Sequence, residues 1–236
     1  LLIPPCKLMD QGVINPLLME IVKANSREPI ANEGDIYALI ACCEAGATRL
    51  AGMMEEFGID QLDELADYII DTSYQGTVDA IAELPKGTWQ SVLTVDGYER
   101  EIDLHAALTI TDTQVLLDFD GTSGLSNKGI NVPLNYATAY SVFALRCIIG
   151  PDIPNNAGTL DAITVSAPDN TILNAPHPCA VVARSTIGHM LPDVIFGCLH
   201  QALPGRVPAE GTSNLWNVKL GAGHGITERT EGETTA

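Results

Sequence analysis

Apolar positions recur at helical spacing through the first third of the chain. A stripe with members three or four residues apart runs through residues 34–58 and stops at Gly58, a residue type that commonly follows the last turn of a helix. A second helical pattern follows Asp60, which we expect to act as the N-cap of that helix. Earlier in the chain, Asn15 followed by Pro16 predicts the start of a shorter helix. The first stripe consists of Ile36, Leu39, Ile40, Cys43, Ala47, Leu50 and Met54. We predict that the two long helices form an antiparallel hairpin.

The apolar spacing changes to every second residue after position 86. Residues 87–121 predict three strands, with turns at Asp96–Gly97 and Thr111–Thr113. Helical patterns return at 137–149 and 192–203, with two short strands expected on either side of the turn at 168–170. The order predicts an α+β fold: a long N-terminal helical hairpin, then a mixed, mainly antiparallel sheet with packed helices. We expect a helical region at 1–85, an α+β region at 86–220 and a flexible tail at 221–236.

The hydrophobic content and the net charge of the chain limit the kinds of partner that it is expected to bind. Among 236 residues, 46% are hydrophobic, so a large core is available, and the formal net charge of −18 repels phosphate backbones and anionic lipid surfaces. The sequence also lacks a run of about 20 apolar residues of the kind that spans a bilayer. We therefore predict neither a nucleic-acid partner nor a membrane partner.

The cysteines and the first residues bear on cellular context. Six cysteines occur without a CxxC pair, and several lie in apolar runs, which favours buried free thiols in a reducing cytoplasm over a disulfide framework. The chain opens on Leu1 with sequence typical of the middle of a domain, and no signal-peptide pattern is present. We expect a cytoplasmic protein and a fragment of a longer polypeptide.

Common catalytic motifs are absent from the sequence. It contains no phosphate-binding P-loop, GxSxG, HExxH or GxGxxG pattern. His189, Asp193 and His200 have spacings close to whole helical turns, so an independent metal hydrolase is one hypothesis. Pro192 interrupts a continuous helix between the two histidines, which favours ordinary packing for these side chains instead.

The segment LLDFDGTSGLSNKGINVP, residues 116–133, is the strongest local candidate for a site. Asp118 and Asp120 point to one face if the strand continues through both, and two close carboxylates can bind a cation or share a proton. The alternative is that both aspartates accept hydrogen bonds from turn amides. The residues alone leave both interpretations open.

Six segments in order resemble the B subunit of the hydantoinase/oxoprolinase family, whose relatives include N-methylhydantoinase, 5-oxoprolinase, caprolactamase and the acetone and acetophenone carboxylases. The resemblance extends from Leu2 to Asn214. The usual family pattern reads DF-GTS, so Asp118, Thr122 and Ser123 match it while Asp120 does not. The segments are LIPPCKL, residues 34–58, residues 116–133, IPNNAG, residues 163–186 and ALPGRVPAEGTSN.

This resemblance implies an ATP-dependent hydrolase of small cyclic amides, or a related carboxylase, that works as a homo- or hetero-oligomer with an A subunit that binds ATP. It implies a divalent metal in the full-length protein, held by ligands that precede Leu1, and no metal ligand within this chain. It places Asp118 in a catalytic role and Thr122, Ser123 and Asn131 at the substrate. The chain alone is then expected to be inactive. The alternative is a non-catalytic scaffold or assembly domain of the same complex.

Overall fold

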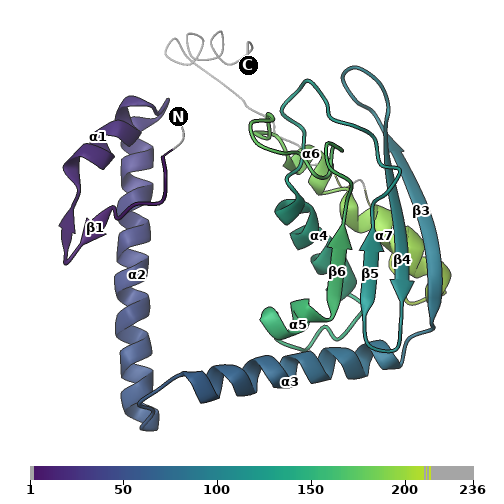
Figure 1. Ribbon diagram of the computed structural model, residues 1–236, viewed down its shortest axis with the longest axis horizontal. Helices are drawn as coiled ribbons and strands as arrows, with labels where there is room; N and C mark the ends of the chain where they lie inside the picture. The colour runs from purple at the N-terminus through teal and green to yellow at the C-terminus, as the bar shows by residue number, and fades with distance from the viewer. Residues whose placement is uncertain (1–2, 210, 212, 214–236) are drawn as a thin grey trace. The chain divides into compact units, whose positions relative to one another are not determined.

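The computed structural model describes residues 3–209, 211 and 213, and these divide into two compact units between Glu64 and Leu65 (Figure 1). The first unit is helical with a small hairpin. The second contains a four-stranded sheet and most of the core. Each unit is described by itself, and the tail predicted at 221–236 lies outside the described residues.

The first unit opens with a hairpin of β1 (Met9–Asp10) and β2 (Val13–Ile14). Gln11 and Gly12 form its turn with positive φ angles. The helix α1 (Pro16–Ala24) then begins as predicted, because Asn15 Oδ1 accepts hydrogen bonds from the N–H groups of Leu17 and Leu18. α1 packs on the long helix α2.

The helix α2 (Pro29–Phe57) is 29 residues long and none of its residues is buried. It ends where predicted, since Gly58 adopts the left-handed conformation with φ of 64° and its N–H bonds to carbonyls of the last turn. Among the described helices, α2 alone passes a length and composition test for a membrane span, with a mean hydropathy of 1.2 over its best 18 residues. Because none of its residues is buried, the apolar stripe of α2 is covered within its own unit only in part, by α1 and the hairpin.

The second unit is built on a sheet with strand order β3-β4-β5-β6. The first two pairings are antiparallel and β5 pairs with β6 in parallel, so the predicted mixed, mainly antiparallel sheet is confirmed. The predicted turns at 96–97 and 111–113 fall between the first three strands. The strands are β3 (Gly87–Val95), β4 (Ile102–Ile110), β5 (Val115–Asp118) and β6 (Ile163–Ser166).

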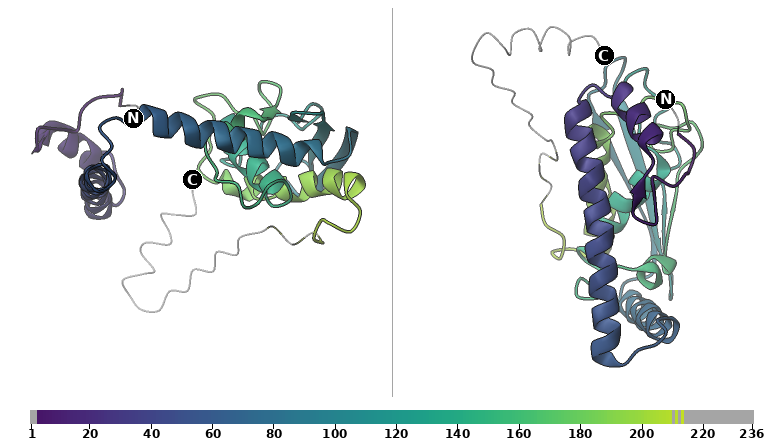
Figure 2. Two further views of the ribbon diagram at one scale, coloured as in Figure 1. Left: turned by 90° about the horizontal axis from the view of Figure 1, so that it is seen from below. Right: turned by 90° about the vertical axis from the view of Figure 1, so that its left-hand side faces the viewer.

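Helices cover one face of this sheet and leave the other open. α4 and α7 pack against each other and on the strands, and the α3 helix crosses the end of the sheet at which β3 and β6 begin (Figures 1 and 2). The even-numbered residues of β4 are buried under the helices, while its odd-numbered residues face outward. The helices are α3 (Asp63–Ala82), α4 (Leu134–Arg146), α5 (Ala157–Asp161), α6 (Ser185–Gly188) and α7 (Leu191–Ala202).

Three local predictions need correction or completion. α3 begins at Asp63 rather than just after an Asp60 cap, so the acidic residues Asp63 and Glu64 stand in its first turn. The segment after the turn at 168–170 makes a single bridge, Gly124 to Thr171, in place of a second strand. Both long helices exist, but they fall in different units, and their antiparallel pairing stays a prediction.

The thiols of the described chain are all free, as predicted, but the predicted burial is wrong for most of them. Cys6, Cys42, Cys43 and Cys147 are exposed, whereas Cys198 is buried in α7. Burial raises the pKa of the Cys198 thiol to about 11, and its Sγ donates to the Ala106 carbonyl at 3.4 Å.

We expect an aromatic disulfide reagent at neutral pH to label Cys147 in the native protein and to leave Cys198 unmodified. The Cys198 thiol is buried, so the reagent does not reach it, and its raised pKa leaves little of the reactive thiolate. Peptide mass spectrometry after timed labelling measures the difference. Denaturant should make the two sites react alike. Equal labelling rates in the native protein would contradict the buried position of α7.

Candidate functional site at the β5–α4 junction

The candidate site begins where two parallel strands end side by side. β5 and β6 run in the same direction, so their carboxyl ends meet at one edge, and Asp118 stands opposite Ser166. The Ser166 Oγ donates to Asp118 Oδ1 at 3.0 Å, and the Phe119 N–H donates to the Ser166 carbonyl at 2.9 Å. Asp118 is exposed on the open face of the sheet. Its second carboxylate oxygen is therefore available to a ligand.

Asp120 does not share a strand face with Asp118. β5 ends at Asp118, and the Asp120 N–H donates to Asp118 Oδ1 at 3.2 Å. This is the turn arrangement that the sequence left open as an alternative to a carboxylate pair. Gly121 follows with φ of 87°, a conformation that favours glycine.

His105 lies beside this turn, which the sequence did not predict. A side chain at position 121 would come within 3.2 Å of His105 Nδ1, so the glycine and the imidazole ring are in close contact. Asp118 stands opposite Ala107 on β4, so His105 and Asp118 face the same open side of the sheet. The alternating pattern of β4 indicated that His105 lies on the open face of the sheet. Its nearness to the turn follows only from the register between β4 and β5.

Thr122 and Ser123 bind the loop to β4 through their side chains. The Thr122 Oγ1 accepts from the His105 N–H at 3.0 Å and donates to the His105 carbonyl at 3.2 Å. The Ser123 Oγ accepts from the Asp103 N–H at 2.9 Å. Both side chains thus extend the ladder of β4 past the end of β5.

Asn131 joins its own loop to the backbone at Ala180, at a site that is only 1% exposed. Its Oδ1 accepts from the Ser126 N–H at 2.8 Å. Its Nδ2 lies 2.9 to 3.1 Å from the carbonyls of Ser126, Lys128 and Ala180. The Ser126 hydroxyl in turn donates to Glu99 at 3.0 Å. The amide is therefore fully engaged and fixes the loop that leads into α4.

The structure thus separates the predicted site residues into two kinds. Thr122, Ser123 and Asn131 use their polar atoms on backbone groups, while Asp118 retains an accessible carboxylate on the same face of the sheet as His105. A carboxylate and an imidazole on a rigid edge can orient a substrate N–H or accept a proton. Contact of Thr122, Ser123 and Asn131 with a substrate stays a prediction.

The alternative metal site is not assembled. No cluster of three or more His, Cys, Asp or Glu side chains suitable for a metal occurs among the described residues. The His189 ring packs on Tyr140 with centroids 4.9 Å apart, and Asp193 accepts a hydrogen bond from the Ser213 hydroxyl. An independent metal hydrolase built on His189, Asp193 and His200 is therefore wrong, because these side chains do not form a set that could hold a metal.

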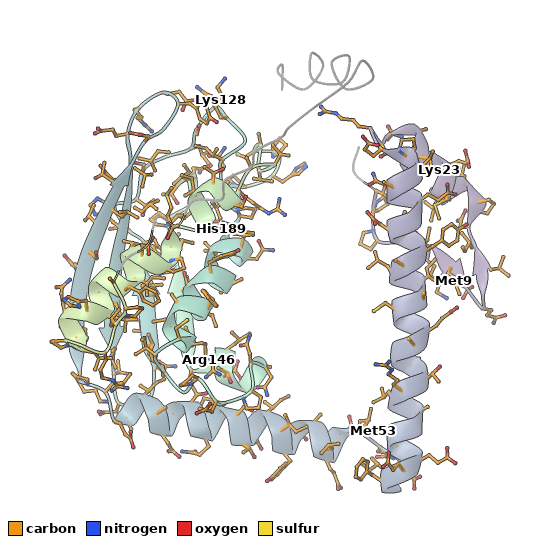
Figure 3. The ribbon with its side chains drawn as sticks, turned by 180° about the vertical axis from the view of Figure 1, so that it is seen from behind. Met9, Lys23, Met53, Lys128, Arg146 and His189 are labelled. Atoms are coloured by element: carbon orange, nitrogen blue, oxygen red, sulfur yellow. The ribbon has the colours of Figure 1, made fainter. Side chains whose placement is uncertain are left out.

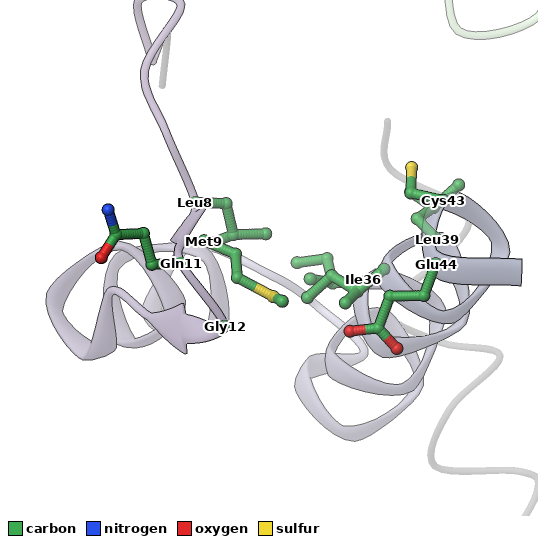
Figure 4. Close-up of a pocket in the computed structure, with 9 residues that line it drawn as sticks. Leu8, Met9, Gln11, Gly12, Ile36, Leu39, Cys43 and Glu44 are labelled. Carbon is green, nitrogen blue, oxygen red and sulfur yellow. The ribbon is translucent and has the colours of Figure 1, made fainter. Parts of the chain in front are cut away.

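An apolar pocket of about 400 Å³ lies within the first unit, between the β1–β2 hairpin and α2 (Figure 4). Met9 points toward Ile36 across it, and Glu44 stands at its border. The polar groups needed to hold a substrate are few here, so this pocket is a poorer candidate than the β5–β6 edge.

Comparison with known proteins gives a consistent result. The family described as hydantoinase B/oxoprolinase matches residues 1–235. A protein of Pseudomonas sp. strain NS671 described as the putative B subunit of a D-/L-hydantoinase is 30% identical over 224 residues. That alignment covers 89% of this chain and 38% of the relative.

Two solved structures share the fold. The ATP-dependent caprolactamase from Pseudomonas jessenii superimposes with a TM-score of 0.78 at 22% identity, over 87% of this chain and 36% of the caprolactamase chain. A nucleotide-free acetone carboxylase gives a TM-score of 0.73 at 16% identity, over 85% of this chain and 29% of that one. This chain therefore spans less than two fifths of the length of each of these three proteins.

Proposed function

The chain belongs to the hydantoinase B/oxoprolinase family, and we propose that it forms part of the B subunit of an ATP-dependent enzyme that hydrolyses small cyclic amides. The observation that carries this proposal is the family match over residues 1–235. The relative described as the B subunit of a hydantoinase and the caprolactamase fold point to the same reaction class. A related carboxylase is the nearest alternative, because the acetone carboxylase has the same fold.

The proposed chemistry explains why ATP is needed. An amide carbon is a poor electrophile because its nitrogen shares electrons with the carbonyl group. Transfer of the γ-phosphoryl group of ATP to the amide oxygen releases ADP and creates a good leaving group. Water then adds to the carbon, and the tetrahedral intermediate collapses with cleavage of the C–N bond, which releases the amine and leaves an acyl phosphate. A second water hydrolyses the acyl phosphate to an open-chain carboxylate and inorganic phosphate. We assign ATP binding to a partner A subunit.

The residues of this chain contribute through the β5–β6 edge. We propose that Asp118 orients the substrate N–H or the attacking water, while Thr122, Ser123 and Asn131 hold the loop beside it. The divalent metal that the family resemblance implies does not fit the described residues, since they gather no set of three ligating side chains. No step on this chain is therefore assigned to a metal.

Asp118→Asn in the full-length protein should lower turnover by about 100-fold or more, since it removes the charge but keeps an oxygen for Ser166 and Asp120. The measurement is ring opening in the assembled enzyme at saturating ATP. Asp112→Asn is the matched control, because Asp112 is exposed in the β4–β5 turn at the other end of the strand. Turnover within a factor of two of the parent for both variants would remove Asp118 from the chemistry.

A scaffold function is the second candidate, and α2 favours it. This helix has 29 residues and no buried one, with Leu39 at 66% and Leu50 at 44% exposure along one stripe. Such a surface fits a helix that packs against a partner subunit. Leu50→Glu should then abolish assembly, whereas Ala45→Glu on the opposite face of α2 should not. Assembly that is insensitive to both would reject this function.

The proposed enzyme function is tested by purifying the full-length protein with its A subunit. The complex is incubated with ATP and a panel of cyclic amides that contains hydantoin, lactam and oxoproline rings. We expect mass spectrometry to detect a ring-opened carboxylate from at least one of them. A complete complex that consumes none of these rings but carboxylates a ketone would favour the carboxylase alternative.

A further inference from the structure

A second pocket, in the sheet unit, is lined by none of the residues described at the β5–β6 edge. It has a volume of about 610 Å³, within the usual range for small-molecule sites. One side consists of α4, and the other of the loop at 151–155 and Leu160 of α5. Phe143 is 58% exposed and Leu160 is 43% exposed at its border, which are high values for such large apolar side chains. The pocket is therefore lined by exposed apolar side chains together with a few polar ones.

Arg146 is the single cationic side chain that lines this pocket. It stands at the last residue of α4, at the end of that helix nearest α3 (Figure 3). Its Nη1 donates to the carbonyls of Ile149 and Gly150, and its Nη2 donates to that of Ile153. A guanidinium carries five N–H donors, so within the described residues the Nε–H and one Nη2–H have no recorded acceptor. These two nitrogens can together hold a carboxylate in the bidentate manner.

No acidic side chain among the described residues neutralises Arg146. The ion pairs found there all lie in the first unit, on Lys7 and Lys23. Asp152 and Asp161 are close along the chain but form no ion pair with the guanidinium. Partial burial also lowers the pKa of Arg146, because burial disfavours the charged form. An anion beside it would replace the missing solvation.

The other polar groups of the pocket are uncharged. Thr138 and Asn155 make no side-chain hydrogen bond within the described residues, and Asn135 uses its Oδ1 on the Tyr136 N–H. Val142, Phe143 and Leu160 supply apolar surface next to them. The arrangement thus offers one fixed positive charge, neutral donors and an apolar wall.

We propose that this pocket binds a small organic carboxylate, with its charged end on Arg146 and its apolar body against Val142, Phe143 and Leu160. The size of the pocket and the single charge select a compact ligand with one carboxylate. The inference goes beyond the proposed enzyme function and does not rest on it, since binding is measured without ATP, a partner or turnover.

Titration calorimetry with hexanoate tests the proposal, with hexanamide as the neutral ligand of the same shape. We expect hexanoate to bind at least about tenfold more tightly, because the amide forfeits the charge-assisted bonds to the guanidinium. Asn155→Asp places a carboxylate at the pocket and should weaken hexanoate binding about fivefold or more, with little change for hexanamide. Asn127→Asp is the control, since it makes the same change of charge on an exposed loop outside the pocket.

Arg146→Gln should remove the preference for hexanoate over hexanamide. Because this variant also loses bonds to the loop at 149–153, the Asn155→Asp comparison decides the matter if Arg146→Gln fails to fold. Equal affinities for hexanoate and hexanamide, equal effects of Asn155→Asp and Asn127→Asp, or no binding at about 10 mM hexanoate would each overturn the proposal. Binding of inorganic phosphate without hexanoate would overturn it too, in favour of a general anion site.

Discussion

Gly158→Ala should destabilise the sheet unit by about 3 kcal/mol and lower its melting temperature by about 6–12 °C. A methyl group at this position would stand 2.0 Å from the Ile70 carbonyl oxygen and 3.0 Å from the Tyr74 nitrogen. Both of those atoms belong to the backbone of α3, so no side chain can rotate to make space. α5 would have to move away from α3, and the hydrogen bond from Asn156 Nδ2 to Ser73 Oγ would lengthen from 2.8 Å.

Gly76→Ala provides the matched control for this prediction. It lies on α3 near the same loop, but a methyl group there would meet Ile153 at 3.4 Å, which is ordinary contact. Because alanine also favours a helix, this variant should melt at or slightly above the temperature of the parent. Thermal unfolding followed by circular dichroism distinguishes the two. Equal melting temperatures for both variants would show that α3 and α5 are not in close backbone contact.

Asn131→Ala should cost about 3 kcal/mol of unfolding free energy, because it leaves a buried N–H and three carbonyls without their partner. Asn131→Asp has nearly the same shape and tests the cause. It should be at least as damaging, since a carboxylate would face the carbonyls of Ser126, Lys128 and Ala180 instead of donating to them. Denaturant titration of each variant gives the free energies.

Asn127→Ala is the control for the Asn131 series, because Asn127 is an exposed neighbour in the same loop. Its unfolding free energy should stay within about 0.5 kcal/mol of the parent. A tolerated Asn131→Ala that nevertheless weakens substrate binding would support the prediction made from the family resemblance, in which this amide contacts the substrate. Loss of stability in Asn131→Asp and Asn131→Ala would assign the residue to the loop.

Local chemistry in the sequence determined much of the fold. The Asn15 cap with Pro16 and the left-handed Gly58 were predicted because a helix end depends on a few adjacent residues. The strands β3 and β4 were predicted from strict alternation, which follows from one buried face. α3 was less accurate: Asp60 and Asp63 both suit a helix start, and the helix begins at the later one.

The candidate site depended on contacts that local patterns do not carry. Asn131 reaches Ala180, which is 49 residues away, and Thr122 bonds to His105, which is 17 residues away. The sequence therefore showed polar side chains in a turn, but it did not show that these side chains bond to backbone groups of distant segments. The same limit hid the contact between Gly121 and His105, which arises only when β4 and β5 pair in register.

The proposed ATP-dependent hydrolysis is tested most directly by the coupling between ATP consumption and ring opening. The full-length protein that carries this chain is combined with its A subunit and a cyclic amide that the complex consumes, and ADP and ring-opened product are quantified together. We predict that both products rise in a fixed ratio and that ring opening stops when ATP or either subunit is omitted. Ring opening that proceeds without ATP, or at an unchanged rate without this protein, would contradict it.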